Sequence, residues 1–189
     1  MSKIGYMGIE GSFSEIAAEK LAKQTGLTNA EYVPMTNAQN ILQALQEKNI
    51  AYGVLAVRNS SVGPVSEFVE TFQNISYEIL GEYTLPIHHC LFKKSTDIPI
   101  KQLTSVASHP QALAQTRQNR GKNYPSLIEQ YAADTALAAQ WLACGKLPED
   151  TAIICSEKGG NLWGLDLIAR NIEDSDENHT IFWLLKLTK

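Results

Sequence analysis

The sequence predicts an α/β protein built from two βα lobes with a ligand cleft between them. Strand-like and helix-like stretches alternate over residues 3–72 and again over residues 105–163. Between these runs, residues 77–92 form a long extended region that has no helical period. Short connections between strands and helices favour a largely parallel, helix-covered sheet in the first lobe. A cleft between two such lobes is where a small ligand is expected to bind.

The lobe boundaries are expected where the alternation stops and restarts. The first lobe is predicted to hold residues 1–76 and 165–189, and the second lobe residues 77–164. Both belong to one domain that spans residues 1–189. Residues 165–169 are interpreted as a strand that returns toward the first lobe. The strands are predicted at residues 3–7, 31–33, 52–57, 77–86, 87–92, 105–107, 126–130, 151–155, 165–169 and 181–187.

The helices of the first lobe are predicted from capping signals. Ser12, followed three residues later by Glu15, has the form of a capping box and predicts a helix that Gly26 ends. A second pair of this kind, Thr36 with Gln39, predicts the start of the next helix.

The helices of the second lobe also begin at polar residues. Ser108 is expected to cap a helix that runs to about residue 119. Asp134 is expected to cap a helix at residues 135–144, and residues 156–163 are interpreted as a short helix interrupted by glycines.

Residues 58–63 form a polar loop between a predicted strand and a predicted helix. Hydrophobic residues recur at helical spacing from Val65 to Phe72, and Pro64 fits the first helical position. A helix N-terminus behind a hydroxyl-rich loop presents free backbone N–H groups, which bind anions. An ordinary strand-to-helix turn explains the same residues equally well.

The composition excludes several classes of function. Lys and Arg number 16 and Asp and Glu number 20, so the net charge is −4. This charge disfavours nucleic acid and anionic membranes as partners. No apolar run approaches the length of a membrane span, so a soluble, cytoplasmic protein is expected. Cys90, Cys144 and Cys155 lie in apolar surroundings without C-x-x-C spacing and are expected to be buried and reduced.

The histidines do not predict a metal site. His88 and His89 are adjacent, so in a strand they would face opposite sides of the sheet. His109 and His179 are far apart in the sequence, and no metal-binding spacing is present.

Hydroxyl and amide side chains gather at predicted strand ends and helix starts, where they can face a cleft. Each also has a structural explanation: Ser12 and Ser108 as helix caps, residues 59–61 as a turn, and Thr180 as an ordinary strand residue. Residue types alone therefore indicate a binder of a small, anionic molecule without specifying a reaction.

The order of these motifs resembles the catalytic domain of the prephenate dehydratase family. Residues 5–14 (GYMGIEGSFS) are similar to the family segment G-P-E-G-[TS]-[FY]-S. Residues 53–63 (GVLAVRNSSVG) are similar to G-[IV]-x-P-[IV]-E-N-S-x-x-G. Further similar segments follow in the family's order at residues 85–91 (LPIHHCL), 105–113 (SVASHPQAL), 134–139 (DTALAA) and 178–182 (NHTIF).

The resemblance implies a fold like that of the type II periplasmic binding proteins, with the active site in the interlobe cleft. It implies a lyase of phenylalanine biosynthesis that converts prephenate to phenylpyruvate, losing water and carbon dioxide, without a metal or organic cofactor. The family's catalytic threonine corresponds to Thr180. The substrate-binding residues that the resemblance implies are Ser12, Phe13, Ser14, Arg58, Asn59, Ser60, Ser61, Gly63, Ser108, His109, Gln111 and Thr135.

Two residues depart from the family pattern. Arg58 stands where the family has Glu, and Ile181 stands where the family has an Arg that follows the catalytic Thr. One hypothesis is that Arg58 binds a substrate carboxylate in place of the missing Arg. The alternatives are a diverged homologue that decarboxylates prephenate without aromatising it, or a non-catalytic binder of small carboxylates.

The resemblance also bears on partners. Family members usually continue into a regulatory ACT domain that binds phenylalanine, and no such domain is expected within residues 1–189. The expected partners are a small dicarboxylate such as prephenate and a second copy of the chain in a homodimer. The sequence does not separate prephenate from its amino analogue arogenate.

Overall fold

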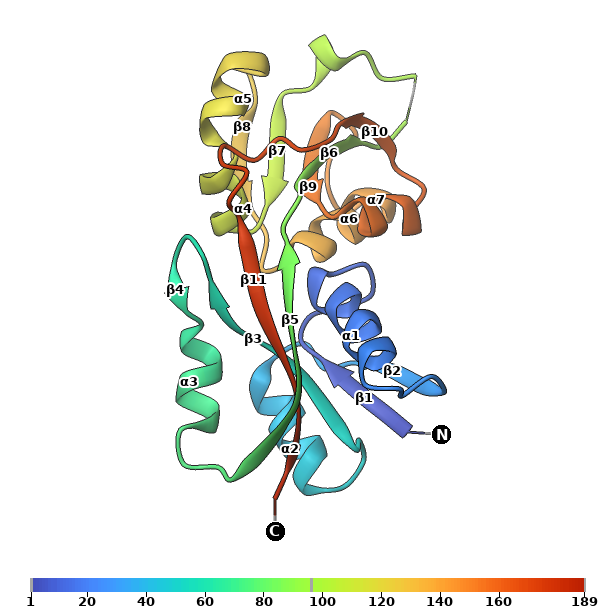
Figure 1. Cartoon of the computed structure of the whole chain (residues 1–189). Coiled ribbons are helices and arrows are strands. Elements are labelled where there is room, and N and C mark those ends of the chain that lie inside the picture. Colours follow the sequence, from blue (N-terminus) through green and yellow to red (C-terminus); the bar gives the residue numbers. More distant parts are fainter. Residues whose placement is uncertain (1, 96, 189) are drawn as a thin grey trace. The chain divides into compact units, whose positions relative to one another are not determined.

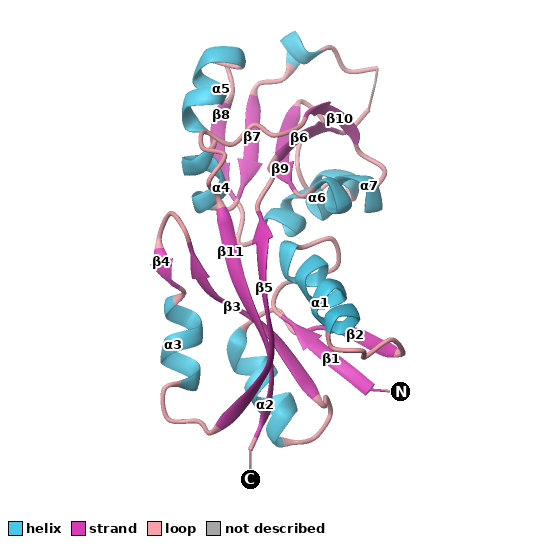
Figure 2. Ribbon diagram, in the orientation of Figure 1, coloured by secondary structure: helices cyan, strands magenta, loops and turns pink. Residues whose placement is uncertain are grey.

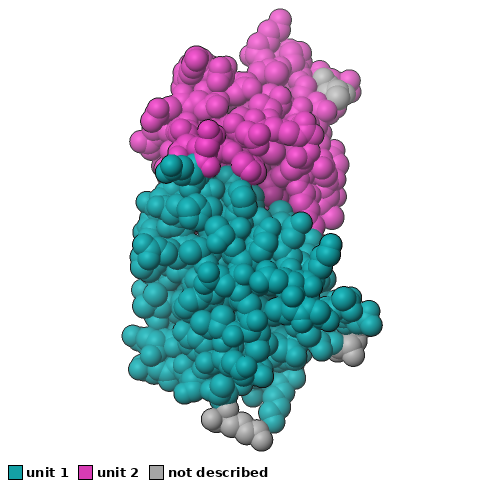
Figure 3. Space-filling model, viewed as in Figure 1, with its two compact units in different colours: residues 1–87, 177–189 teal, residues 88–176 magenta. Residues whose placement is uncertain are grey.

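The computed structural model describes residues 2–95 and 97–188 of the chain. The chain folds into two compact units, each with its own sheet and its own helices (Figures 1 and 3). Unit 1 holds residues 1–87 and 177–189, and unit 2 holds residues 88–176.

Unit 1 is built on a six-stranded sheet with the strand order β2-β1-β3-β11-β5, in which β4 pairs with β3. β1 runs parallel to β2 and β3, whereas β11 runs antiparallel to β3 and β5. The sheet is therefore mixed rather than largely parallel, because β11 lies between β3 and β5 and is antiparallel to both. The strands are β1 (Ser2–Tyr6), β2 (Ala30–Pro34), β3 (Tyr52–Asn59), β4 (Gly63–Pro64), β5 (Tyr77–Pro86) and β11 (His179–Leu187).

Helices cover both faces of this sheet, and each face has its own hydrophobic core. α1 (Phe13–Gln24) packs on one face and α3 (Ser66–Phe72) on the other, as Figure 2 shows. The α1 core includes Ala17, Leu21, Val54, Phe182 and Leu184. The opposite core, formed with α2 (Ala38–Gln46) and α3, includes Ile41, Leu45, Leu55, Val57, Phe68, Phe72 and Leu185.

Unit 2 is built on a five-stranded sheet with the order β10-β6-β9-β7-β8. β7 runs parallel to β8 and β9, whereas β6 runs antiparallel to β9 and β10. Its strands are β6 (Cys90–Lys93), β7 (Ser105–Ser108), β8 (Ile128–Tyr131), β9 (Thr151–Cys155) and β10 (Asp166–Ala169). Its helices are η1 (Ile100–Gln102), α4 (Pro110–Gln115), α5 (Arg117–Asn123), α6 (Thr135–Ala143) and α7 (Glu157–Leu162).

The unit boundaries differ from the lobe boundaries expected from the sequence. β5 belongs to unit 1, because all of its residues except Leu80 pair with β11. β10 belongs to unit 2, because it pairs with β6, so it is not a strand of the first lobe. The chain thus passes between the units at residues 87–88 and 176–177.

Two of the predicted helix caps are confirmed. The Ser12 hydroxyl accepts the backbone N–H of Glu15 at 3.3 Å, and α1 follows it. The Asp134 carboxylate accepts the N–H groups of Ala136 and Leu137 at 2.7 and 3.2 Å, and α6 follows it. Both side chains satisfy N–H groups that have no partner inside their helices.

Two other predicted caps are wrong by one residue. Asn37, not Thr36, caps α2, and its side chain accepts the N–H of Asn40 at 2.8 Å. His109, not Ser108, caps α4, while Ser108 is the last residue of β7. In each pair the capping residue is the one whose backbone is extended just before the first helical turn.

The predicted strand–loop–helix at residues 52–72 is a hairpin followed by a helix. β3 continues through Arg58 and Asn59, and β4 folds back so that Pro64 lies opposite Arg58. Pro64 is therefore a strand residue, and α3 begins two residues later without a side-chain cap. The loop therefore does not lead straight into the helix, as the sequence predicted, but turns back into β4 first.

The prediction for the cysteines holds at two of the three positions. Cys90 and Cys155 are buried and free, but Cys144, the residue after α6, is exposed. Burial raises the pKa of the Cys90 and Cys155 thiols, so both are uncharged at neutral pH. No helix in the described part of the chain is long and apolar enough to span a membrane.

Candidate active site

The direction of the strands in unit 1 brings several polar residues to one end of its sheet. β1, β3 and β5 run in the same direction, so their carboxyl ends lie at the end where β11 begins. Ser12 and the start of α1 directly follow the loop after β1. We refer to this end, which carries Ser12, Asn59 and Thr180, as the Thr180 end of unit 1. Ligands of open α/β sheets commonly bind at such ends.

At this end, Asn59 and Thr180 face each other across two paired strands. They are register partners in β3 and β11, and the Asn59 Nδ2 group donates to the Thr180 hydroxyl oxygen at 2.9 Å. Both side chains are buried, with 5% and 8% of their surface exposed. A hydroxyl and an amide that are this buried are held in a defined arrangement.

The orientation of the Asn59 amide follows from its other hydrogen bond. The Asn59 Oδ1 atom accepts the backbone N–H of Ser61 at 2.9 Å, so the NH₂ group must point toward Thr180. The Thr180 oxygen is then an acceptor, and its own O–H remains available as a donor. No acceptor for this proton is present in residues 2–95 and 97–188.

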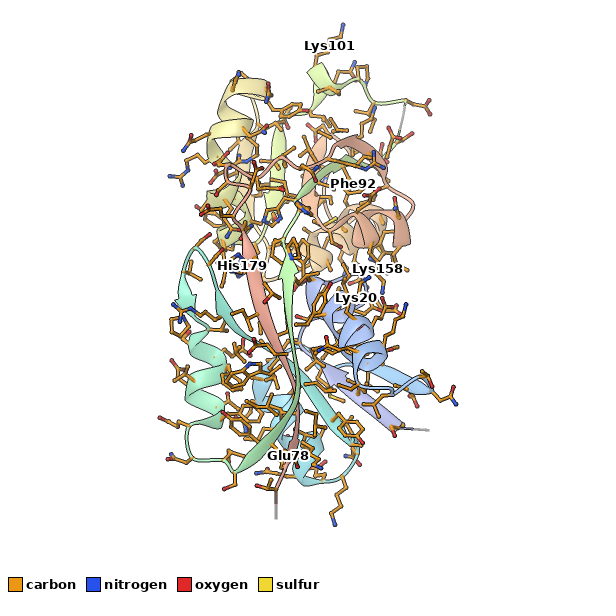
Figure 4. The ribbon with its side chains drawn as sticks, viewed as in Figure 1. Lys20, Glu78, Phe92, Lys101, Lys158 and His179 are labelled. Atoms are coloured by element: carbon orange, nitrogen blue, oxygen red, sulfur yellow. The ribbon has the colours of Figure 1, made fainter. Side chains whose placement is uncertain are left out.

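Backbone groups around His179 fix the position of Thr180. The His179 carbonyl accepts from the Ser60 N–H at 2.9 Å and from the Asn59 amide at 3.1 Å. The Ser60 hydroxyl accepts the His179 N–H at 3.0 Å and donates to the Glu177 carbonyl at 2.9 Å. His179 itself lies at the start of β11 (Figure 4). The Ser60 hydroxyl therefore bonds to a distant backbone segment rather than within its own turn, and it holds the start of β11.

Asn178 belongs to the same network and is not among the residues that the sequence predicted. It is 4% exposed, its Oδ1 atom lies 3.4 Å from the Asn59 Nδ2 atom, and its carbonyl accepts the Ile87 N–H at 2.9 Å. In the sequence, only its position inside segment 178–182, which resembles a family motif, could have indicated that Asn178 belongs to this network.

Ser12, Phe13 and Ser14 lie at the start of α1, at the Thr180 end. Ser12 is buried and serves as the helix cap, and Phe13 packs against the α1 core. Ser14 is half-buried. Tyr6, the last residue of β1, is fully buried, and this burial and the nearby carboxylates of Glu15, Glu10 and Glu19 raise the pKa of its phenol. Tyr6 is therefore neutral at neutral pH.

Arg58 and Gly63 lie in the hairpin beside this site. Arg58 is exposed, and its register partners are Ile181 on β11 and Pro64 on β4. Ile181 packs into the α2–α3 core, so cross-strand pairing places Arg58 on the face of the sheet opposite to Thr180. The register thus does not bring Arg58 together with Thr180. Gly63 has φ = 81°, the left-handed conformation that the hairpin turn requires.

In unit 2, the other predicted site residues also lie at the carboxyl ends of parallel strands. β7, β8 and β9 run in the same direction, and the starts of α4, α6 and α7 follow their ends. His109 and Gln111 lie at the start of α4, and Thr135 is the first residue of α6. We refer to this end as the Thr135 end of unit 2.

The predicted residues at the Thr135 end differ in burial and in whether their side chains already make hydrogen bonds. Ser108 is fully buried, and its hydroxyl donates to the Ile154 carbonyl at 2.6 Å, which gives it a structural role. The His109 Nδ1 atom accepts the Gln111 N–H at 3.2 Å. Thr135 is half-buried, and its side chain has no hydrogen-bond partner among the described residues.

A buried carboxylate in unit 2 escaped the sequence reasoning. Glu173 accepts from the His89 backbone N–H at 2.8 Å, and its other oxygen lies 2.7 Å from the His88 Nδ1 atom. The His89 ring lies with its Nε2 atom 3.0 Å from the Gln115 side chain, and burial lowers the pKa of His89. Within the described residues, no group of three or more potential metal ligands is present.

A groove of about 490 Å³ lies at the other end of the unit 1 sheet. Its walls include Phe68, Phe72 and Tyr77, and Tyr77 is paired with Leu187, the last residue of β11. The seven residues between Thr180 and Leu187 span roughly 23 Å at the rise of a strand. Among the described residues, none that lines the groove carries a positive charge, so this part of the groove does not favour a dicarboxylate.

Comparison with known proteins gives consistent results over nearly the whole chain. A family model described as prephenate dehydratase matches residues 4–189. Arogenate dehydratase/prephenate dehydratase 2, chloroplastic, from Arabidopsis thaliana is 33% identical over 183 residues. These residues are 97% of this chain and 46% of that protein, so the chain spans less than half of this relative's length.

Two solved structures confirm the predicted fold class. Prephenate dehydratase in complex with L-Phe from Arthrobacter aurescens has a TM-score of 0.87 at 23% identity, covering 99% of this chain and 61% of that one. A periplasmic substrate-binding protein of an ABC transporter from Coxiella burnetii has a TM-score of 0.52 at 13% identity, covering 97% and 84%. At these identities the likeness concerns the fold alone. Because the family model covers all but the first three residues, this chain belongs to the prephenate dehydratase family.

Proposed function

We propose that this chain is a prephenate dehydratase, a carbon–oxygen lyase, in which Thr180 is the proton donor. The observation that carries the proposal is the Asn59–Thr180 hydrogen bond at 2.9 Å. The amide occupies the Thr180 oxygen as an acceptor and leaves its O–H as a donor. Family membership supports the choice of substrate.

The proposed reaction needs one proton and no electron acceptor. The bond between the ring carbon and its carboxylate breaks, carbon dioxide leaves, and the electron pair moves into the ring. The ring C–O bond to the 4-hydroxyl then breaks, and the Thr180 proton makes the leaving group water. Solvent returns a proton to Thr180, so prephenate and one proton become phenylpyruvate, carbon dioxide and water. Aromatisation drives the reaction, so placing an acid at the leaving group is the main task of the site.

The two carboxylates of prephenate require hydrogen-bond donors. We assign part of this role to the Thr135 end of unit 2, where Thr135, His109 and Gln111 lie near the starts of helices. Ser12, Phe13 and Ser14 are proposed to supply further contacts from unit 1. The proposed reaction needs no metal or organic cofactor.

The test is a direct assay of the purified chain with prephenate at neutral pH, without added metal or cofactor. Phenylpyruvate is followed by its absorbance in alkali, and carbon dioxide is measured in parallel. Product above the spontaneous rate is expected. A rate equal to the spontaneous rate would refute the dehydratase, and carbon dioxide without phenylpyruvate would indicate a non-aromatising decarboxylase instead.

Matched variants test the role of Thr180. Thr180→Val keeps the shape of the side chain but removes the hydroxyl, so kcat should fall by about 10²-fold or more. Thr180→Ser keeps the hydroxyl and should retain activity within about 10-fold. Equal kcat values for the Val variant and the unmodified chain would remove Thr180 from the mechanism.

Arogenate is the second candidate substrate, because the name of the Arabidopsis thaliana relative includes both activities. Prephenate carries a keto group where arogenate carries an ammonium group. Both share the ring, its carboxylate and the 4-hydroxyl. Comparing kcat/KM for the two substrates in the same preparation decides between them. A ratio above about 10 in either direction would assign the preferred substrate.

We further infer that the chain works in the cytoplasm as a homodimer. The described cysteines are free, which fits a reducing compartment, whereas the Arabidopsis thaliana relative is named as chloroplastic. Light scattering on the eluting peak of a size-exclusion column tests the dimer, because a mass near 20.9 kDa would show a monomer.

A further inference from the structure

The register between β3 and β11 contains one extra residue beside the Thr180 end. Ile181 lies opposite Arg58, but the next residue, Phe182, lies opposite Ala56. Val57 therefore has no partner on β11, which makes this position a β-bulge. Bulges next to functional sites commonly change the direction of the side chains that follow them.

The bulge determines which side chain of β3 accompanies Thr180. In an unbroken ladder continued from the pair of Ala56 and Phe182, Val57 would lie opposite Ile181 and Arg58 opposite Thr180. A shift of one residue also moves each side chain to the other face of the sheet. With the bulge, Asn59 lies opposite Thr180 and its amide reaches the hydroxyl.

Independent contacts hold the bulged register. Val57 is 8% exposed and packs into the α2–α3 core. Its carbonyl accepts the Val65 N–H at 3.0 Å, which secures the bulge on the hairpin side. Beyond the bulge, the two hydrogen bonds between Ser60 and His179, at 2.9 and 3.0 Å, would not survive the shift.

We propose that the bulge at Val57 is a positioning device that gives Thr180 a neutral amide as its partner and turns Arg58 to the opposite face. The catalytic meaning of this device rests on the proposed function. A guanidinium beside Thr180 would attract a substrate carboxylate to the place that the leaving hydroxyl must occupy. Asn59 instead orients the hydroxyl without drawing an anion, so Asn59 is a positioning residue for Thr180.

The first test measures the arrangement itself and does not require activity. In the ¹H–¹⁵N spectrum of the full chain, the side-chain amide signal of Asn59 is assigned by its loss in Asn59→Ala. Thr180→Val removes the acceptor and should shift this signal. An unshifted signal would overturn the pairing on which the proposal rests.

A deletion tests whether Val57 is the extra residue that the bulge absorbs. Without Val57, an unbroken ladder would itself pair Ala56, Arg58 and Asn59 with Phe182, Ile181 and Thr180, so no bulge would be needed. The folded deletion variant should therefore retain the Asn59 signal and its response to Thr180→Val. Loss of this response would show that the extra residue of β3 is not Val57, and would overturn the proposal.

The second test is kinetic, and it decides the question if the deletion variant does not fold. Asn59→Ala should lower kcat by about 10-fold or more with KM changed by less than about 3-fold, because a misdirected proton donor affects the chemical step. Arg58→Ala should change both constants by less than about 3-fold. A 10-fold loss of kcat/KM in Arg58→Ala would place Arg58 near the reacting atoms and overturn the face assignment. If the unmodified chain shows no dehydratase activity, the proposed function fails while the spectroscopic test still decides the bulge.

Discussion

The direction of a neighbouring amide determines the hydrogen bonding of Thr180. The Ser61 N–H determines which atom of the Asn59 side chain faces Thr180, and that choice makes the threonine oxygen an acceptor. A buried hydroxyl that accepts one hydrogen bond in this way still has its own proton to donate. The substrate's leaving hydroxyl is the acceptor that the proposed reaction supplies.

His89 is expected to make stability depend on pH in the acidic range. Burial lowers the pKa of His89 in the folded chain, although Gln115 and Glu173 oppose this effect. The unfolded chain therefore binds the proton at a higher pH than the folded chain. The contribution of the buried, neutral His89 to the free energy of unfolding is complete above the ordinary pKa of about 6.5. This contribution is lost as the pH falls below that value.

The measurement is urea unfolding at about pH 7.5 and about pH 5.5, on either side of the ordinary pKa. His89→Gln offers an amide N–H toward Gln115 but does not titrate, so it should lose less stability between the two pH values than the unmodified chain. His179→Gln, at a partly exposed histidine, is the control. Equal losses in the unmodified chain and His89→Gln would refute the expectation.

The three cysteines are expected to react very differently with a thiol reagent. Cys144 is exposed, whereas Cys90 and Cys155 are buried and their thiol pKa values are raised. An aromatic disulfide reagent at neutral pH should modify one thiol in the folded chain and all three after denaturation. Cys144→Ser should abolish the fast reaction, and a second fast thiol would contradict the burial of the other two.

Residue roles divide clearly into those that sequence can predict and those that it cannot. The Ser12 and Asp134 caps were predicted from local patterns and are confirmed, whereas the role of Thr180, predicted from its motif, stays a prediction. The cap of α4 was misassigned because Ser108 and His109 are both compatible with capping, and strand pairing decides which one leaves β7. Asn178 was missed because its partners, Asn59 and Ile87, are distant in the sequence.

At the scale of elements, α7 depends on close packing against β6. A methyl group on Gly160 would overlap the ring of Phe92, a fully buried residue of β6 (Figure 4). Gly160→Ala should therefore destabilise the chain by about 1–3 kcal/mol, the usual range for an overpacked core. Denaturant unfolding measures this difference.

Gly121 provides a matched control for Gly160. It also lies inside a short helix, α5, but a methyl group there would meet no atom within 4 Å. Gly121→Ala should leave stability unchanged or raise it by up to about 1 kcal/mol, because alanine favours a helix. Similar losses in the two variants would show that helix propensity, rather than the contact with Phe92, determines the effect.

The limits of sequence reasoning are clearest in the hairpin of β3 and β4. The apolar run ends at Val57, so pattern reading ended the strand there, although pairing with β11 continues to Asn59. A bulge leaves no mark on the alternation of residue types, because polar residues at a strand end are compatible with either face. The sequence pattern consequently did not indicate that Arg58 pairs with Ile181, on the face of the sheet opposite to Thr180.

At the scale of the whole molecule, the predicted α/β class with two lobes is observed, but the boundaries moved. Residues 77–86 have no helical pattern, which is equally typical of a connection and of a strand in either sheet. Their pairing with β11 assigns them to unit 1. Such pairing joins segments about a hundred residues apart, and no local pattern reports it.

The proposed reaction requires both units, and this requirement can be measured. Thr135→Val removes a hydroxyl at the Thr135 end of unit 2 and leaves the Asp134 cap of α6 in place. If this hydroxyl binds a substrate carboxylate, KM should rise by about 10-fold while kcat changes little. Thr135→Ser keeps the hydroxyl and should restore KM.

Thr180→Val should show the opposite pattern, because its hydroxyl acts on the chemical step: kcat falls and KM changes little. The two residues belong to different units and share no hydrogen-bond partner among the described residues, so the losses in kcat/KM should multiply in the double variant. An unchanged KM in Thr135→Val would exclude this hydroxyl from substrate binding. If kcat/KM of the double variant is no lower than that of Thr180→Val alone, the two hydroxyls act on the same step. The assignment of substrate binding to unit 2 and of proton transfer to unit 1 would then be wrong.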